Sequence, residues 1–151
     1  MANTQAMCTS FKGELLVGHH NFGTGVTRGS TAADSFKAAL YLASATVNAA
    51  TTAYSASDEV SGTGYTAGGV AVTFGTVPST SGTTAFVTPS ASISYSSVTL
   101  STAFDCVLIY NSTQSNKAVS VHTFGSQTVT AGTFTLTMPT NDASTGLIRL
   151  A

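Results

Sequence analysis

The sequence predicts an all-β protein, an antiparallel β-sandwich of the jelly-roll type, and three observations carry this prediction. Short apolar segments alternate with a period of two residues, as in strands with one buried face. Clusters of Gly, Pro, Asn and Ser separate these segments, as expected of turns. No helical pattern is long enough to connect two parallel strands. The 151 residues fit a single domain overall.

Residues 1–33 are predicted to form an N-terminal arm. A short helix is expected through Phe11 and Leu15, which lie one turn apart on the same helical face, and Gly18 is a suitable residue to end it. A helix of two turns is marginal in water, so its apolar side chains must pack on the main domain or on a neighbouring subunit. The Gly-rich segment 19–29 follows without any periodicity.

Residues 34–151 are predicted to form the sandwich, with about eight strands. The expected strands are 36–42, 70–74, 85–88, 93–100, 104–110, 118–124, 128–138 and 146–150. The pattern of residues 36–42 indicates a half-buried strand, although the alanines in this segment leave a helix as an alternative. Residues 104–110 are nearly all apolar, which is typical of a central strand covered on both faces.

Three connections have distinct turn signals. The apolar positions change phase at Ser96–Ser97, where one extra residue would form a β-bulge. Four glycines between residues 62 and 69 predict turns with positive φ. Residues 75–83, rich in Ser, Thr and Gly and containing Pro78, are predicted to be a loop.

The surface composition favours a component of an assembly over a freely diffusing enzyme. Only 11 residues carry a formal charge, whereas 47 are Ser or Thr. Soluble proteins usually have about 25% charged residues, so hydroxyl groups provide most of the hydration here. A net charge of -1 without clustered Lys and Arg does not favour direct binding to nucleic acid.

Other global features concern membranes, localisation and cysteines. No stretch approaches the roughly 18 apolar residues of a membrane helix, so no membrane partner is expected. The first ten residues lack the pattern of a secretory signal, and we expect the protein to stay in the cytoplasm in which it is made. Cys106 is expected to be a buried thiol, and a disulfide between Cys8 and Cys106 is left open.

No motif predicts a catalytic residue, a metal site or a cofactor, and we expect the protein not to be an enzyme. His19 and His20 are adjacent, so in an extended chain their rings point to opposite faces. Asp58 and Glu59 are neighbours on a turn and would diverge, although a long-range carboxylate partner is left open. Residues 62–68 depart from the GxGxxG spacing, and no helix follows them.

Four blocks of the sequence carry a resemblance to a known family. They are Ser10–Phe22, Asp34–Leu42, Glu59–Gly69 and Leu108–Val119. Together they resemble small virion proteins of tailed bacteriophages, and they are most similar to the head cement, or decoration, proteins of short-tailed phages. The resemblance covers most of the chain and depends on overall likeness, because the family has no catalytic motif to match.

The resemblance implies a jelly roll on the outer face of an icosahedral capsid in the virion. Such proteins clamp adjacent major capsid protein subunits without covalent links, partly by adding strands to a partner's sheet. The implied partners are the major capsid protein and further copies of this chain, as a homodimer or a homotrimer. A location on the tail instead of the head is left open.

The arm supplies the candidate contact residues for such a partner. The predicted partner-binding residues are Phe11, Lys12, Glu14, Leu15, Phe22 and Arg28. The apolar members would anchor on a neighbour, and the charged members would set the register of the contact. Deletion of residues 1–30 is accordingly predicted to leave a folded sandwich that no longer binds shells. The alternative for the arm is a disordered tail.

Other functional classes have weaker signals. A tail or fibre-associated module that binds glycans or receptors would need aromatic stacking surfaces, and the chain has five Tyr but no Trp. A depolymerase would need a convergent pair of carboxylates. An ice-binding protein would need a regular ladder of Thr, and the threonines here follow no steady period.

Overall fold

The computed structural model describes residues 3–8, 10–11, 15, 18–23 and 33–151. The described chain contains eight strands, and every pairing between them is antiparallel. They are β1 (Ala6–Met7), β2 (Phe36–Leu42), β3 (Val70–Val72), β4 (Ser79–Ser81), β5 (Thr84–Val87), β6 (Ile93–Asn111), β7 (Lys117–Leu136) and β8 (Ile148–Leu150). The prediction of an all-β, antiparallel fold is therefore confirmed.

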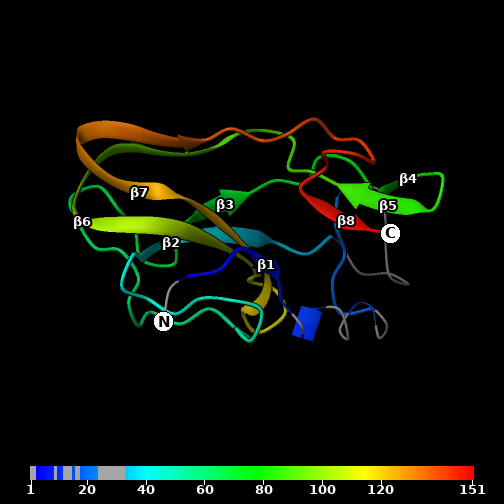
Figure 1. Cartoon of the computed structure of the whole chain (residues 1–151), viewed down its shortest axis with the longest axis horizontal. Helices are drawn as coiled ribbons and strands as arrows, with labels where there is room; N and C mark the ends of the chain where they lie inside the picture. Colours follow the sequence, from blue (N-terminus) through cyan, green and yellow to red (C-terminus); the bar gives the residue numbers. More distant parts are fainter. Residues whose placement is uncertain (1–2, 9, 12–14, 16–17, 24–32) are drawn as a thin grey trace.

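The strands form two sheets, as a sandwich requires. The larger sheet has the order β1-β7-β6-β2-β3, and the smaller one has the order β4-β5-β8 (Figure 1). The jelly-roll connection stays a prediction. Four predicted strands merge into the two long strands β6 and β7, while β1 and β4 were not predicted. These two missed strands have only two and three residues, too few to show an alternating pattern.

The long hairpin of β6 and β7 folds back on itself, so that each strand contributes to two layers (Figure 1). The second half of β6 pairs with β2 inside the large sheet. The first half lies over the same sheet, because the Tyr95 hydroxyl donates a hydrogen bond of 2.9 Å to the carbonyl oxygen of Ala38 on β2. The space between the two layers contains much of the apolar core.

Extra residues in the hairpin allow it to bend. Tyr95 is opposite Phe134 and Val98 is opposite Gly132, so β6 has one residue more than β7 between these pairs. Ser97 in this interval has a φ of 55°, which confirms the bulge predicted at Ser96–Ser97. A second irregularity lies on β7, where Ala131 has a φ of 45°.

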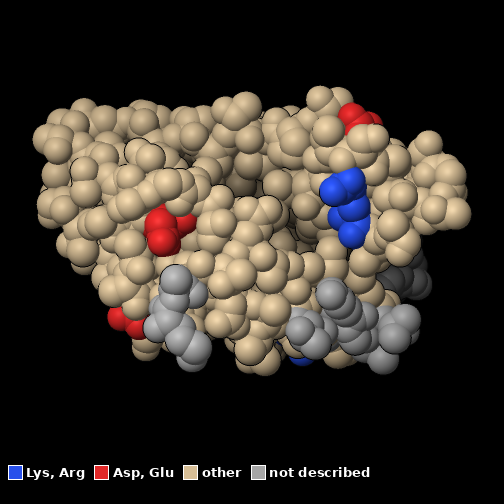
Figure 2. Space-filling model, in the orientation of Figure 1, with Lys and Arg blue, Asp and Glu red and all other residues tan. Residues whose placement is uncertain are grey.

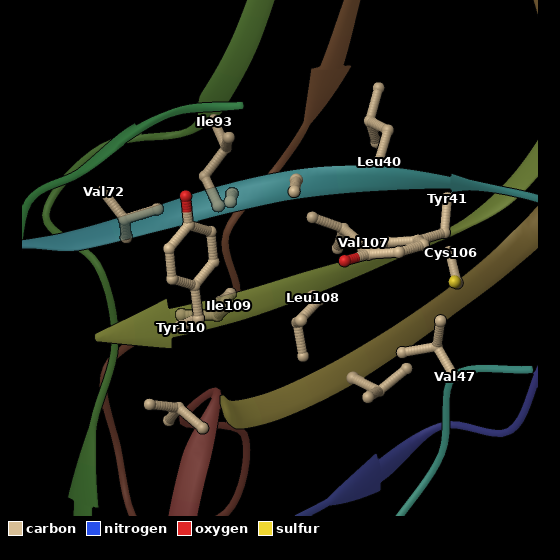
Figure 3. Close-up of a cluster of buried hydrophobic side chains, with 14 of the residues drawn as sticks. Leu40, Tyr41, Val47, Val72, Ile93, Cys106, Val107, Leu108, Ile109 and Tyr110 are labelled. Carbon is tan, nitrogen blue, oxygen red and sulfur yellow. The ribbon is translucent and has the colours of Figure 1, made fainter. Parts of the chain in front are cut away.

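The centre of the large sheet is covered on both faces. Residues 106–111 of β6 are all buried, as predicted for a central strand. The prediction that β2 is only half-buried is wrong, because Ala39 and Tyr41 are as buried as the residues that alternate with them. The second face of β2 and β6 is covered by the connection after β2, which contributes Val47 to the cluster in Figure 3.

The described part of the N-terminal segment packs on the main domain, which is one of the two alternatives that the sequence left open for its apolar side chains. β1 pairs with β7 through Ala6 and Met7. Phe11 and Phe22 are 1% and 5% exposed and pack in the same cluster as the strands. The division of the chain at residue 33 into an arm and a sandwich stays a prediction. Removal of residues 1–30 would uncover the core instead of leaving a complete sandwich.

The short helix is described only in part. Ser10, Phe11 and Leu15 have helical conformation. The Gly18 amide donates to the Leu15 carbonyl at 3.1 Å, and Gly18 has a φ of 68°, as in a glycine that ends a helix. The remaining positions of the predicted helix lie outside the described residues, so its full extent stays a prediction.

Both cysteines are buried, and no disulfide joins Cys8 to Cys106. Burial, and to a lesser degree the neighbouring Asp105 carboxylate, raises the pKa of the Cys106 thiol to about 12. In the part of the chain that the structure describes, no helix has the length and apolar composition that crossing a membrane requires.

Gly69 provides a test of the packing between the glycine-rich loop and β2. A β-carbon at this position would lie 1.7 Å from the Ala38 carbonyl oxygen, and its φ is 72°. We expect Gly69→Ala to lower the free energy of unfolding by about 3 kcal/mol or more, measured by urea denaturation. Gly125→Ala is the control, because a β-carbon there meets nothing within 4 Å. Equal losses in the two variants would contradict this account.

Candidate functional site

A pocket of about 390 Å³ lies between the N-terminal segment and the small sheet. It is lined by Phe11, Leu15, Gly18, His20, Asn21 and Phe22 of the N-terminal segment, by Pro78, by Ala85, Phe86 and Val87 of β5, and by Ile148 and Leu150 of β8. No charged residue is among these lining residues. The pocket therefore suits an apolar group, and Asn21 and His20 are its polar side chains.

Aromatic packing holds the N-terminal wall of this pocket in place. The Phe22 ring stacks on Phe36 of β2 with a centroid separation of 4.7 Å. Its edge-to-face contacts are with Phe74 at 4.9 Å and with Phe11 at 5.8 Å. Such pairs add about 0.5–1.5 kcal/mol each beyond the burial of their area. The wall is thus part of a preformed site.

A buried polar cluster fixes the same wall to the end of β6. The Asp34 carboxylate accepts hydrogen bonds from the backbone N–H of Asn21 at 3.1 Å and from Asn111 Nδ2 at 2.8 Å. Asn111 is fully buried, and its Nδ2 also lies 3.1 Å from His20 Nδ1. The residues of this cluster are up to 91 positions apart, so local patterns in the sequence did not reveal it.

The rim of the pocket is apolar and exposed. Leu150 is 42% exposed and Val77 is 38% exposed, and these are the exposed large apolar side chains of the described chain. Leu150 lines the pocket, and Val77 immediately precedes the lining residue Pro78. Exposed apolar surface that is gathered at one concave site is typical of a binding surface.

The three described candidates from the sequence converge on this pocket. Phe11, Leu15 and Phe22 all line it, but they form its wall instead of reaching out to a neighbour. Lys12, Glu14 and Arg28 lie outside the described residues. The sequence did not predict that β8 lines the pocket, because the pattern of residues 146–150 indicated only a strand at the end of the chain. Its pairing with β5 is set by the tertiary structure.

No family model, curated protein or solved structure matches this chain.

The carboxylate of Glu59 is surrounded by donors from its own chain. Its oxygens accept from the Tyr54 hydroxyl at 2.7 Å, the Tyr65 hydroxyl at 2.8 Å and the Gly68 amide at 2.8 Å. Burial raises the pKa of Tyr65, and its hydrogen bond to Glu59 and the negative charge there raise it further. Asp58 is exposed beside this cluster. The predicted divergence of the pair agrees with this arrangement, and Glu59 braces the loop against the sheet.

The tyrosines form an internal cluster instead of an open stacking surface. Tyr54 stacks on Tyr110 with centroids 4.8 Å apart, and Tyr65 stacks on Tyr95 at 5.9 Å. The Tyr41 hydroxyl donates to the Ser55 carbonyl at 2.5 Å. All five tyrosines of the chain are thus engaged within the fold. These tyrosines therefore do not provide the open aromatic surface on which the glycan-binding alternative would stack a sugar ring.

A Ser–His pair lies on β7, in which Ser120 is buried and His122 is partly buried. His122 Nε2 is 2.9 Å from the Ser120 hydroxyl, and burial lowers the pKa of His122 to about 4. The imidazole is therefore neutral at pH 7. Ser120 is only 3% exposed, so a substrate carbonyl has no access to its hydroxyl without movement of the sheet. Among the described residues, no group of three His, Cys, Asp or Glu side chains could hold a metal ion.

Glu59 can be tested as a structural brace. We expect Glu59→Ala to lower the free energy of unfolding by about 2–4 kcal/mol, because three donors lose a charged acceptor. The measurement is urea denaturation followed by circular dichroism. Asp58→Asn is the matched control, since Asn tolerates the positive φ of 60° at this exposed position. A loss of the same size in the control would refute the proposed role of Glu59.

The depressed pKa of His122 predicts a loss of stability in mild acid. The unfolded chain binds a proton near pH 6.5, whereas the folded chain binds it only near pH 4. Stability that is present above pH 6.5 is accordingly lost as the pH falls to 4, by up to about 3 kcal/mol. The free energy of unfolding of the wild type and of His122→Asn, measured across this range, gives the His122 contribution as a difference. If the free energies of unfolding of the two proteins changed with pH in parallel, a contribution from His122 would be excluded.

Proposed function

We propose that this chain is a virion structural protein, a capsid cement or decoration protein that binds the outside of a phage head. In this role it clamps adjacent major capsid protein subunits without covalent links. The observation that carries the proposal is the uncharged pocket with its exposed apolar rim at Leu150 and Val77. The sequence resemblance to head cement proteins supports the same role.

The small sheet offers backbone hydrogen bonds next to this pocket. β5 is paired on both sides, whereas β4 and β8 each have one outer edge that no other described strand covers. β4 is fully exposed, and Leu150 of β8 lines the pocket. An extended segment of a capsid subunit could add to either edge and place an apolar side chain in the pocket. Main-chain bonds would supply affinity, and the pocket would supply specificity.

The surface composition keeps the cost of such a contact low. The accessible surface is 7341 Å² and the chain has 11 charged residues, or roughly one charge per 670 Å². A contact of about 800 Å² per partner therefore removes only one or two charges from water. Many copies, each bound weakly to a symmetric shell, would together clamp it by avidity.

The proposal is tested with capsids assembled without this chain, to which the purified protein is added. Binding is measured by co-sedimentation and by occupancy in electron microscopy. We expect the wild type to decorate the shells and Leu150→Asp to lose at least about tenfold in affinity, because a charge would be buried in the pocket. Ser61→Asp is the control, since Ser61 is exposed and does not line the pocket.

Each outcome has a distinct meaning. Shells that bind no wild-type protein would reject the cement function, and binding to a glycan array instead would favour the tail or fibre module. Full binding of a folded Leu150→Asp variant would leave the function in place but reject this pocket as the contact.

A further inference from the structure

The outer side of β7 is open along most of its length. β1 covers it only at Ser120 and Val121, and the Cys8 amide extends this contact to the Val119 carbonyl. From residue 122 to residue 136, no other strand of the described chain pairs with this side. Because the hairpin folds back, both limbs of β7 lie toward the face seen in Figure 1.

A groove lies between the two limbs of β7. It contains a cavity of about 120 Å³, and Val107, Ile109, Phe124 and Leu136 are among the residues that line this cavity. Leu147 lines both this cavity and a second hollow of about 330 Å³, so the two are adjacent. Figure 2 shows the face as hollowed near its centre. Several apolar side chains here are only partly covered by the chain itself, namely Phe124, Phe134, Leu136, Met138 and Leu147.

This edge lacks the protection that exposed strand edges usually have. Residues 118–141 contain no Asp, Glu, Lys or Arg. Natural edge strands commonly carry charges, especially Lys, that prevent pairing with another strand. The one protective feature is the irregularity at Ala131, which leaves residues 132–136 as a short regular stretch. Such an edge can accept another strand without burying any charge of its own.

Asp105 and Arg149 carry opposite charges and lie near the two ends of the segment from Asn3 to Met7. Asp105 accepts a hydrogen bond from Asn3 at 2.5 Å, while Met7 lines the same hollow as Arg149. The segment from Asn3 to Met7 thus runs from the acidic end toward the basic end. Figure 2 shows acidic atoms on one side of the central hollow, and basic atoms with a second acidic group near them on the other side.

Both charged groups retain capacity for a partner. Arg149 donates to the carbonyls of Ser144 and Ala143, both through Nη1. It also lies near Asp142, whose pKa is lowered mainly by the Thr145 amide and to a lesser degree by Arg149. A guanidinium has five N–H donors, and a carboxylate has about four acceptor sites. Neither group is therefore saturated by its contacts within the chain.

We propose that two copies of this chain dimerise through the groove face, about a two-fold axis perpendicular to the line from Asp105 to Arg149. With such an axis, the open edges of β7 in the two copies lie side by side and antiparallel. Residues 132–136 of one copy can then pair with the same residues of the other, which makes the two sheets continuous. The same axis also places Asp105 of each copy opposite Arg149 of the other. A parallel arrangement would instead bring like charges together, so the charge pattern selects the antiparallel dimer.

This interface is separate from the pocket proposed for the capsid. Neighbouring side chains on a strand point to opposite faces, and β8 shows this alternation. Ile148 and Leu150 line the apolar pocket, whereas Arg149 lines the hollow of the groove face. A dimer joined through the groove face would accordingly leave both of its pockets open.

Sedimentation equilibrium of the purified full-length chain tests the proposal. We expect a concentration-dependent dimer for the wild type. Asp105→Arg and Arg149→Asp should each raise the dimer dissociation constant by about tenfold or more, since each places two pairs of like charges across the interface. The double variant Asp105→Arg/Arg149→Asp should restore it to within about threefold of the wild type, because the pairs are reversed and re-formed. Asp58→Asn should dimerise as the wild type does.

The double variant separates an interface from a folding defect. Asp105→Arg also removes the bond to Asn3, so its thermal unfolding is measured alongside. Loss of folding cannot produce rescue by the second substitution. A wild type that stays monomeric, single variants that dimerise normally, or a folded double variant that stays as weak as the single ones would each overturn the proposal.

Discussion

Two strands of 19 and 20 residues, β6 and β7, contribute to both layers of this protein because their hairpin folds back on itself. The bend depends on extra residues in the strands, of which Ser97 and Ala131 have positive φ. The Tyr95 hydroxyl then reaches the backbone of β2 in the other layer. Since a sandwich must bury one face of each layer, this folded hairpin determines where the remaining strands and loops can pack.

The hairpin also explains why one side of the molecule is closed and the other is open. β2 and β3 continue the large sheet on the β6 side, whereas the β7 side has only the two residues of β1. Most apolar side chains of β2 and β3 are buried, whereas Phe124, Phe134 and Leu136 of β7 are only partly buried. The open side is thus a direct result of the unequal coverage of one hairpin.

The N-terminal segment completes the core and creates the pocket at the same time. Phe22 packs into an aromatic cluster with Phe36 and Phe74, and Asp34 connects the segment to Asn111. The segment is in this way held as one wall, with β5 and β8 as the other. Under the proposed function, the pocket would receive a group from a partner, whereas the sequence led us to expect that the segment inserts its own side chains into a neighbour. Because the surface has few charges, the two proposed contacts, at the pocket and at the groove face, would each remove few charges from water.

The sequence by itself determined the features that depend on local backbone preference and composition. Alternation and turn residues located β2 and β5, the phase change located the bulge at Ser96–Ser97, and residue counts described a hydroxyl-rich surface with few charges. Only the tertiary structure decided that Phe11 and Phe22 are internal, that β8 faces them, and that Asp105 and Arg149 lie on one face. The physical reason is that an apolar residue gives the same sequence pattern whether its side chain packs in the core or contacts another protein. Which of the two occurs depends on partners that are distant in the sequence, such as Phe74 for Phe22.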